Sequence, residues 1–266
     1  MPAINLPRLK AQAAELAELY DQPARFVHQL SGVLEYYADR THRPSPSGAE
    51  QTIIPAYRVP AQVLDRIAAT LSKPAKMDPH GILALADALW AERALEYRLL
   101  ACTLLGMIAP SPPEPLTDRL QAWAAENQEE PLLDALADQS LARLRVEAQG
   151  VFLGWVEGWL GNPALHLQKL GLRALGALLA EPHFEDLPTV FRLLEPLFAN
   201  AARDLRPELL GLTQGLARRS PQETAHFLRQ SCTRDLNPNT AWVIRQCLDD
   251  FPAESRAALR EAVRGG

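Results

Sequence analysis

The strongest constraint on the fold is an apolar segment that recurs along the chain at spacings typical of helical repeats. Four copies read LLACTLLGMI, LGLRALGALL, LLGLTQGLAR and WVIRQCLDDF, and they begin at Leu99, Leu170, Leu209 and Trp242. The last three begin 39 and 33 residues apart, and the 71 residues between the first two leave room for another copy around Leu132–Leu153. A period of about 33–40 residues is typical of a solenoid, in which each helix pair buries its apolar face against the next.

Helical signals dominate the rest of the chain as well, with Leu, Ala, Glu, Gln and Arg filling most segments. Apolar residues near the N-terminus keep the spacing of one helix face: Leu6, Leu9, Ala13 and Leu16. Capping residues precede proline at three expected helix starts: Asp78-Pro79, Asn162-Pro163 and Ser220-Pro221. Consensus residues of ankyrin and tetratricopeptide repeats are absent. The sequence therefore predicts an all-α fold, an α-α superhelix of HEAT-like helical pairs, and the alternative is a compact helical bundle without repeats.

We expect one helical-repeat domain over residues 1–266. It would consist of N-terminal helices over residues 1–41, a long loop over residues 42–59 and HEAT-like repeats over residues 60–266. The loop reads HRPSPSGAEQTIIPAYRV and lacks helical spacing. Long loops in compact domains are disproportionately functional, although a surface connection is the simpler interpretation.

The bulk composition is that of a globular chain without overall basicity. The chain is 47% hydrophobic with a net charge of −5, which excludes global disorder and gives no sign of a nucleic-acid partner. The charge is uneven, because residues 1–136 hold 12 Lys and Arg against 17 Asp and Glu, whereas residues 137–266 hold 15 against 15. The second part can therefore still present a basic face.

The cysteines and the apolar runs indicate a cytoplasmic protein. Cys102, Cys232 and Cys247 are an odd number without CxxC spacing, which favours reduced thiols and argues against disulfides or a structural zinc site. The N-terminus carries charges where a signal peptide needs an apolar core, and the run Leu99–Pro110 is shorter than the roughly 20 residues that span a bilayer. We expect a monomer with no metal, no cofactor and no membrane partner.

Common catalytic signatures are absent: the chain has no GxxxxGK[ST], GxGxxG, GxSxG or HExxH motif. Basic residues, however, recur on the similar helices or at their borders. If these helices line one layer of a solenoid, the basic side chains would form a row along its groove: Arg98, Lys169, Arg173, Arg218, Arg219 and Arg245. The alternative is that they are ordinary solvated helix faces.

Three segments, in order, resemble the DNA alkylation repair family, the AlkD-type glycosylases. The first is AYRVPAQVLDRIA from Ala56, similar to the family's Tyr-x-x-Pro entry into an early helix. The second is Leu89-Trp90 followed by EYRLLA from Glu96, which is similar to the family's Glu-x-Arg-x-x-Ala signature. The third is VEGWLGNPALHLQKLGLRALGALL from Val156. In the second segment we expect Glu96 and Arg98 to fix how the helix docks on its neighbours.

The resemblance implies a HEAT-like solenoid whose concave cationic face binds duplex DNA, and whose active members excise N3- and N7-alkylated purines. It implies an Asp that stabilises an oxocarbenium-like sugar, aromatic rings on the cationic nucleotide and a basic residue on the phosphates. Asp134 falls at the catalytic Asp position, but Glu130 replaces a Trp. Lys169 falls at the phosphate-holding Arg position, and Leu212 lies near the second Trp position.

Three hypotheses follow. The first is a DNA-binding HEAT-like repeat protein of this family with weak or no base-excision activity, which recognises duplex or structured DNA. The second is an active alkylpurine DNA glycosylase that uses Asp134 with a rearranged aromatic, such as Tyr57, Tyr97 or Trp155. The third is a protein-interaction scaffold without a nucleic-acid role. Asp134 also has a purely structural interpretation, because an acidic residue in the first turn of the helix after Pro131 interacts favourably with the helix dipole whatever the function.

Overall fold

The computed structural model describes residues 4–39, 54–109, 114–126, 129–232 and 236–265, and the chain divides into two compact units, Met1–Gln149 and Gly150–Gly266. Each unit is a stack of α-helices, and the described residues contain no strand. The all-α prediction is confirmed. The loop predicted over residues 42–59 lies outside the described residues up to residue 53, and the single-domain organisation stays a prediction.

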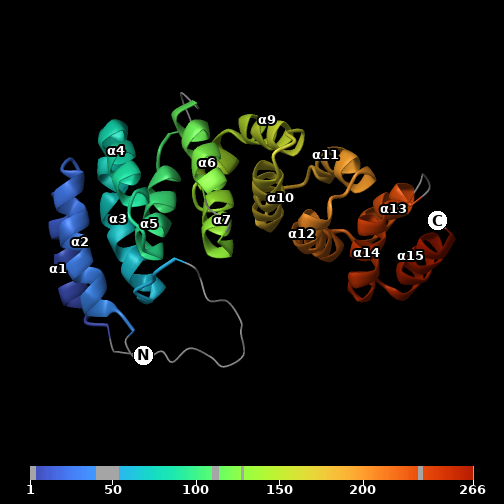
Figure 1. Ribbon diagram of the computed structural model, residues 1–266, viewed down its shortest axis with the longest axis horizontal. Helices are drawn as coiled ribbons and strands as arrows, with labels where there is room; N and C mark the ends of the chain where they lie inside the picture. Colours follow the sequence, from blue (N-terminus) through green and yellow to red (C-terminus); the bar gives the residue numbers. More distant parts are fainter. Residues whose placement is uncertain (1–3, 40–53, 110–113, 127–128, 233–235, 266) are drawn as a thin grey trace. The chain divides into compact units, whose positions relative to one another are not determined.

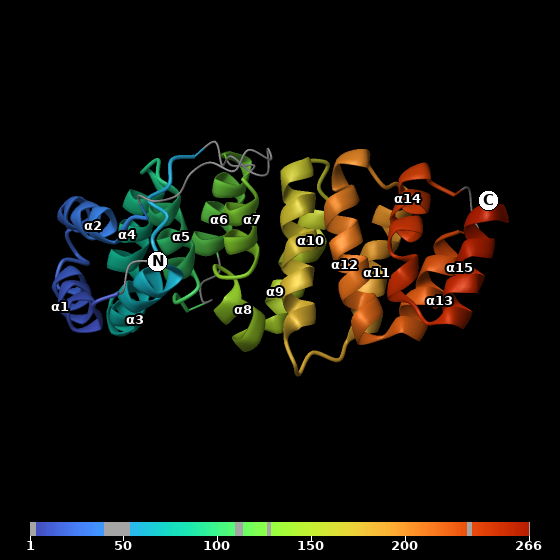
Figure 2. The same cartoon turned by 90° about the horizontal axis from the view of Figure 1, so that it is seen from below.

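The helices of the first unit form two layers (Figures 1 and 2). Contacts join α1 to α3, α3 to α5 and α5 to α7 in one layer, and α2 to α4 in the other. Their bounds are α1 Leu6–Ala17, α2 Pro23–Tyr37, α3 Ala61–Met77, α4 Pro79–Trp90, α5 Leu95–Leu105, α6 Glu114–Glu126, α7 Glu130–Ala137 and α8 Ala142–Glu147.

The second unit also stacks helix pairs. One layer, called here the α10 layer, contains α10, α12 and α14, and the other, the α11 layer, contains α11, α13 and α15. In Figure 1, α12 lies below α11, and α14 lies below α13. The bounds are α9 Gln149–Leu160, α10 Leu165–Ala180, α11 Leu187–Ala199, η1 Arg203–Leu205, α12 Arg206–Arg219, α13 Pro221–Ser231, α14 Pro238–Gln246, η2 Leu248–Asp250 and α15 Ala253–Gly265.

The similar apolar segments fall on α5, α10, α12 and α14. Three of these helices therefore make up the α10 layer of the second unit. The expected intermediate copy at Leu132–Leu153 is no single helix, because α7, α8 and the start of α9 share those residues.

Side-chain hydrogen bonds join neighbouring repeats within each unit. In the first unit, Ser140 donates to the Cys102 carbonyl across 38 positions of sequence. In the second, Arg206 donates to Asn239 across 33 positions and Arg192 to Glu157 across 35. These separations match the repeat period, so the contacts between neighbouring repeats include polar bonds as well as apolar packing.

The local capping predictions have mixed outcomes. Asp78 accepts from the Gly81 amide at 3.0 Å and α4 begins at Pro79, as predicted. Ser220 makes no side-chain cap, although α13 does begin at Pro221. Asn162 accepts from the Ala164 amide at 2.9 Å and so closes a turn before α10. Proline and a polar neighbour thus located helix starts to within about two residues.

Candidate nucleic-acid interface

The solvent-facing side of the α10 layer carries three basic side chains on three successive helices. Lys169 on α10 is partly exposed, and Arg218 on α12 and Arg245 on α14 are exposed. None of the three has a hydrogen bond or ion pair with a described residue. Their charges are therefore available to an external anion.

Arg173 lies one turn beyond Lys169 on α10 but is held within the protein. Its Nη2 donates to Glu208 Oε1 of α12 at 3.0 Å, and the two side chains are only 12% and 2% exposed. Removing one partner of such a buried ion pair is strongly destabilising, because the other partner would remain as an uncompensated charge away from water. The Arg173 charge is thus largely compensated by Glu208.

Arg219, the last residue of α12, is bonded to backbone carbonyls of the preceding repeat. Its guanidinium donates to the carbonyls of Leu179 at 2.6 Å and Glu181 at 2.9 Å, and also to that of Phe184. These carbonyls belong to the C-terminal end of α10 and the connection that follows, where helical partners run out. One side chain therefore holds the α10–α11 connection against the next repeat.

Arg98, in the first unit, has a similar role. Its Nε donates to the carbonyls of Trp90 at 3.2 Å and Glu92 at 2.9 Å, and the guanidinium lies 5.2 Å from the centre of the Trp90 ring. The Trp90 ring stacks on Trp123 at 4.2 Å, nearly parallel. Arg98 thus caps the turn between α4 and α5.

Glu96 explains the charged start of α5. Its carboxylate is buried and accepts the backbone amides of Tyr57 at 3.0 Å and Arg58 at 2.6 Å. Arg58 has a φ of 56°, a left-handed conformation that this bidentate contact helps to hold. The contact docks the segment before α3 onto α5.

Tyr97, the residue after Glu96, has a perturbed phenol. Burial, together with a hydrogen bond to Tyr57, raises the pKa of the Tyr97 hydroxyl, so this hydroxyl stays neutral.

Asp134 lies on α7 and is exposed. It is the fifth residue of the helix, so its expected place in the first turn is wrong, because α7 already begins at Glu130, which is the acidic residue of that turn. Glu130 precedes Asp134 by one turn, so the two carboxylates lie on the same side of α7. Asp134 and Arg98 belong to the first unit, whereas Lys169, Arg173, Arg218, Arg219 and Arg245 belong to the second.

Comparison with known families identifies the chain. The model of the DNA alkylation repair enzyme family matches residues 34–264. The chain belongs to the DNA alkylation repair enzyme family. No curated protein and no solved structure matches it. The resemblance found in the sequence motifs is thereby confirmed, and family membership supports a function related to DNA repair and suggests DNA as a partner.

In this family member, the residues proposed to stand at or replace the family's tryptophans make contacts within the protein. Leu212, near the second Trp position, is 4% exposed and packs in the core. Tyr97 is buried beside Tyr57, and the rings of Trp155 and Trp159 pack with their centres 6.0 Å apart.

Two further features are absent from the described residues. No helix among them is long and apolar enough to cross a membrane, and no group of three or more His, Cys, Asp or Glu among them could hold a metal ion.

Sequence reasoning missed Glu208 and the carbonyl partners of Arg219. Glu208 follows Arg173 by 35 positions, one repeat later, so the repeat period was a usable signal for this pair. Backbone carbonyls have no side-chain signature, so the role of Arg219 could not be read from residue types.

Proposed function

We propose that this family member is a DNA-binding HEAT-like repeat protein with weak or no base-excision activity. The observation that supports the proposal is a set of three cations on the solvent side of the α10 layer that form no ion pair with a described residue: Lys169, Arg218 and Arg245. By the sequence resemblance, Lys169 also falls at the position where the family holds a phosphate with Arg. A lysine contributes charge there without the bidentate geometry of a guanidinium.

If each of the three cations contacts one phosphate, the affinity for DNA depends only moderately on salt concentration. Each neutralised phosphate of a duplex contributes about −0.9 to the slope of log K against log salt, so three contribute about −2.7. Arg98, Arg173 and Arg219 were predicted for the same role, and their hydrogen bonds within the protein make them weaker candidates. Affinity should therefore be moderate and largely independent of sequence.

Fluorescence anisotropy of a labelled duplex across a salt series tests the proposal. We expect the wild-type protein to bind with a slope near −2.7, and the triple variant K169A/R218A/R245A to lose most of the affinity and most of the slope. The matched control is R203A/R229A/R260A, which removes three exposed cations elsewhere in the second unit. No binding at low salt, or equal losses in the two triple variants, would exclude the proposed surface.

A second candidate is an active alkylpurine glycosylase. It is favoured by the exposed carboxylate of Asp134, a residue that the sequence resemblance assigns to the family's catalytic position. A carboxylate there would stabilise the positive charge that develops on the sugar as the glycosidic bond breaks. Release of 7-methylguanine or 3-methyladenine from alkylated DNA, lost in Asp134→Asn, would establish this activity. Absence of release from wild-type protein that binds the same DNA would leave the binding function alone.

The third hypothesis, a protein-interaction scaffold without a nucleic-acid role, predicts the opposite result in the salt series. Such a protein would form a stable complex with a protein partner and would not bind the duplex at low salt. Its net charge of −5 favours this outcome, and the cations of the α10 layer count against it.

A further inference from the structure

A groove runs between α11 and α13 of the second unit. Two adjoining cavities of about 480 and 420 Å³ form it, and they share Phe191, Phe227 and Gln230 as lining residues. The larger reaches Ala199 on α11 and Ser231 on α13, and the smaller reaches Pro188 and Gln222. The groove therefore follows about three turns of α11, roughly 15 Å.

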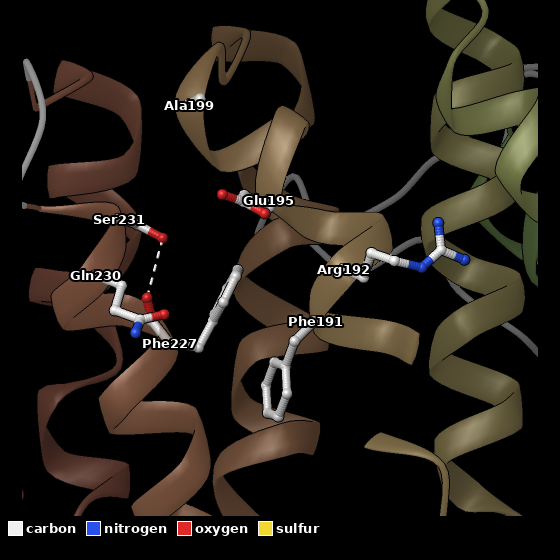
Figure 3. A pocket seen from close by; sticks show the side chains of 7 residues that line it. All are labelled: Phe191, Arg192, Glu195, Ala199, Phe227, Gln230 and Ser231. Atoms are coloured by element: carbon white, nitrogen blue, oxygen red, sulfur yellow. Dashed lines mark hydrogen bonds between the residues drawn. The ribbon is translucent and has the colours of Figure 1, made fainter. Parts of the chain in front are cut away.

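The floor of the groove is aromatic. The rings of Phe191 and Phe227 stack with their centres 5.1 Å apart, and Phe227 meets Phe198 edge-on at 5.2 Å. Figure 3 shows both the Phe191 and the Phe227 ring between the two helices. Phe227 and Phe198 anchor the floor in the core, whereas Phe191 is half-exposed and offers its ring to an occupant. Aromatic walls of this kind favour large apolar side chains.

The rim of the groove is acidic. Glu195 on α11 and Glu223 on α13 are exposed, and neither makes a hydrogen bond or ion pair with a described residue. Arg192 points away from the two rings in Figure 3, and its Nη1 pairs with Glu157 at 2.7 Å. His226 contacts Gln230 at 2.9 Å through its Nε2. Arg192, the cation that lines the larger cavity, is thus paired with Glu157, and neither Glu195 nor Glu223 pairs with a cation among the described residues.

The hydroxyl of Ser231, at one end of the groove, already has a hydrogen-bond partner. Ser231 donates its hydroxyl to the Phe227 carbonyl at 3.1 Å, so this end of the groove does not require a polar ligand (Figure 3). An occupant would gain most from apolar burial along the centre and from positive charge on both sides. Small apolar ligands would fill the floor but leave the two carboxylates without a partner.

We propose that the α11–α13 groove binds a short amphipathic helix of a partner protein, with an apolar side chain against Phe191 and Phe227 and Lys or Arg residues beside Glu195 and Glu223. A helix of about ten residues matches the length of the groove. Apolar residues at helical spacing fill such grooves in known recognition modes. The flanking cations would contribute specificity and association rate through charge complementarity.

The test is a selection of displayed peptides of about 12 residues, enough for three helical turns, on the immobilised full-length protein. We expect the selected peptides to place apolar residues at helical spacing and to flank them with Lys or Arg. A synthetic copy of the strongest peptide is then titrated by fluorescence anisotropy. Its affinity should fall at least about tenfold in F191S and in E195K/E223K.

The matched control is E185K/E261K, which makes the same change of net charge at two exposed carboxylates outside the groove. It should retain wild-type affinity. Both charge variants substitute exposed residues, so they remain informative if F191S fails to fold by circular dichroism. Acidic peptides, or affinity indifferent to the groove variants, would overturn the proposal. A wild-type dimer in analytical ultracentrifugation that E195K/E223K abolishes would also overturn it, because the occupant would then be a second copy of the chain.

Discussion

The residues of the predicted basic row differ in how much they contribute to the stability of the fold. The largest contribution is expected from Arg173, which forms a buried ion pair with Glu208. Arg173→Ala leaves the 2%-exposed carboxylate of Glu208 without its ion-pair partner. We expect a loss of about 3–4 kcal/mol in the free energy of unfolding, measured by urea denaturation. Lys169→Ala, one turn earlier on α10, should change it by less than about 0.5 kcal/mol.

The double variant R173L/E208L separates charge from packing. If the loss in Arg173→Ala comes from an uncompensated buried charge, the double variant should be more stable than Arg173→Ala, because neither charge remains. A double variant less stable than Arg173→Ala would contradict this explanation, because replacing Glu208 would then cost more than leaving its carboxylate without the arginine.

Thiol burial makes stability depend on alkaline pH. Burial raises the pKa of Cys102 and of Cys247 from 9.0 to about 12 in the folded protein. Between about pH 9 and 12 the unfolded chain has therefore lost thiol protons that the folded protein keeps. The free energy of unfolding should fall over this range, by at most about 1.4 kcal/mol per pH unit for each thiol.

The comparison is urea denaturation of wild type and C102A/C247A at several values between pH 8 and 10.5. The variant should decline more gently, with a residual slope because burial also raises the pKa of Tyr37 and Tyr97. Identical slopes would mean that these thiols do not titrate differently on unfolding.

Among the elements, the contact between α5 and α7 depends on a close backbone approach at Gly106. A Cβ there would lie 2.0 Å from the Gln139 carbonyl oxygen, so Gly106→Ala must displace backbone. We expect a loss of about 1–3 kcal/mol in thermal or urea unfolding. Gly176→Ala on α10 is the matched control, because its Cβ meets nothing within 4 Å, and it should stabilise the protein by about 0.5–1 kcal/mol. Equal effects would contradict the close approach.

Helix positions were largely predictable because their signals are local. Spacing of apolar residues located α1, and Asp78-Pro79 located the start of α4, since both depend on residues within one or two turns. The break of the expected intermediate repeat into α7, α8 and α9 was not predictable. Its apolar residues suit one helix as well as three, and the choice depends on packing between repeats.

Over the whole molecule, charge is divided between the units. The net charge of −5 resides in residues 1–149, whereas residues 150–266 hold 13 basic and 13 acidic residues. Glu130 lies one turn from Asp134 on α7, at the position that the sequence resemblance assigns to catalysis. Negative charge beside DNA bound at that position opposes phosphate, so we expect Glu130→Gln to raise affinity for duplex DNA about two- to fivefold at low salt. The gain should shrink as salt is added.

Glu254→Gln is the control for that measurement. Glu254 lies in the first turn of α15, as Glu130 does in α7, so both substitutions remove one charge and one interaction with a helix dipole. Affinity should stay at the wild-type level in Glu254→Gln. An equal increase in DNA affinity in both variants would indicate that affinity depends only on the total charge of the protein and not on the position of Glu130.

The amino-acid sequence alone determined the helical class, the repeat period and the family, because these follow from spacing and from motifs that are continuous along the chain. Only the tertiary structure decided which cations stay available to an external anion. Arg173 and Arg219 find their partners about one repeat away, and Arg98 at carbonyls of the turn before its own helix, whereas Lys169, Arg218 and Arg245 face solvent. All six are the same kind of residue in the same kind of helix. What separates them is which side chain or carbonyl the neighbouring segment brings within hydrogen-bonding distance.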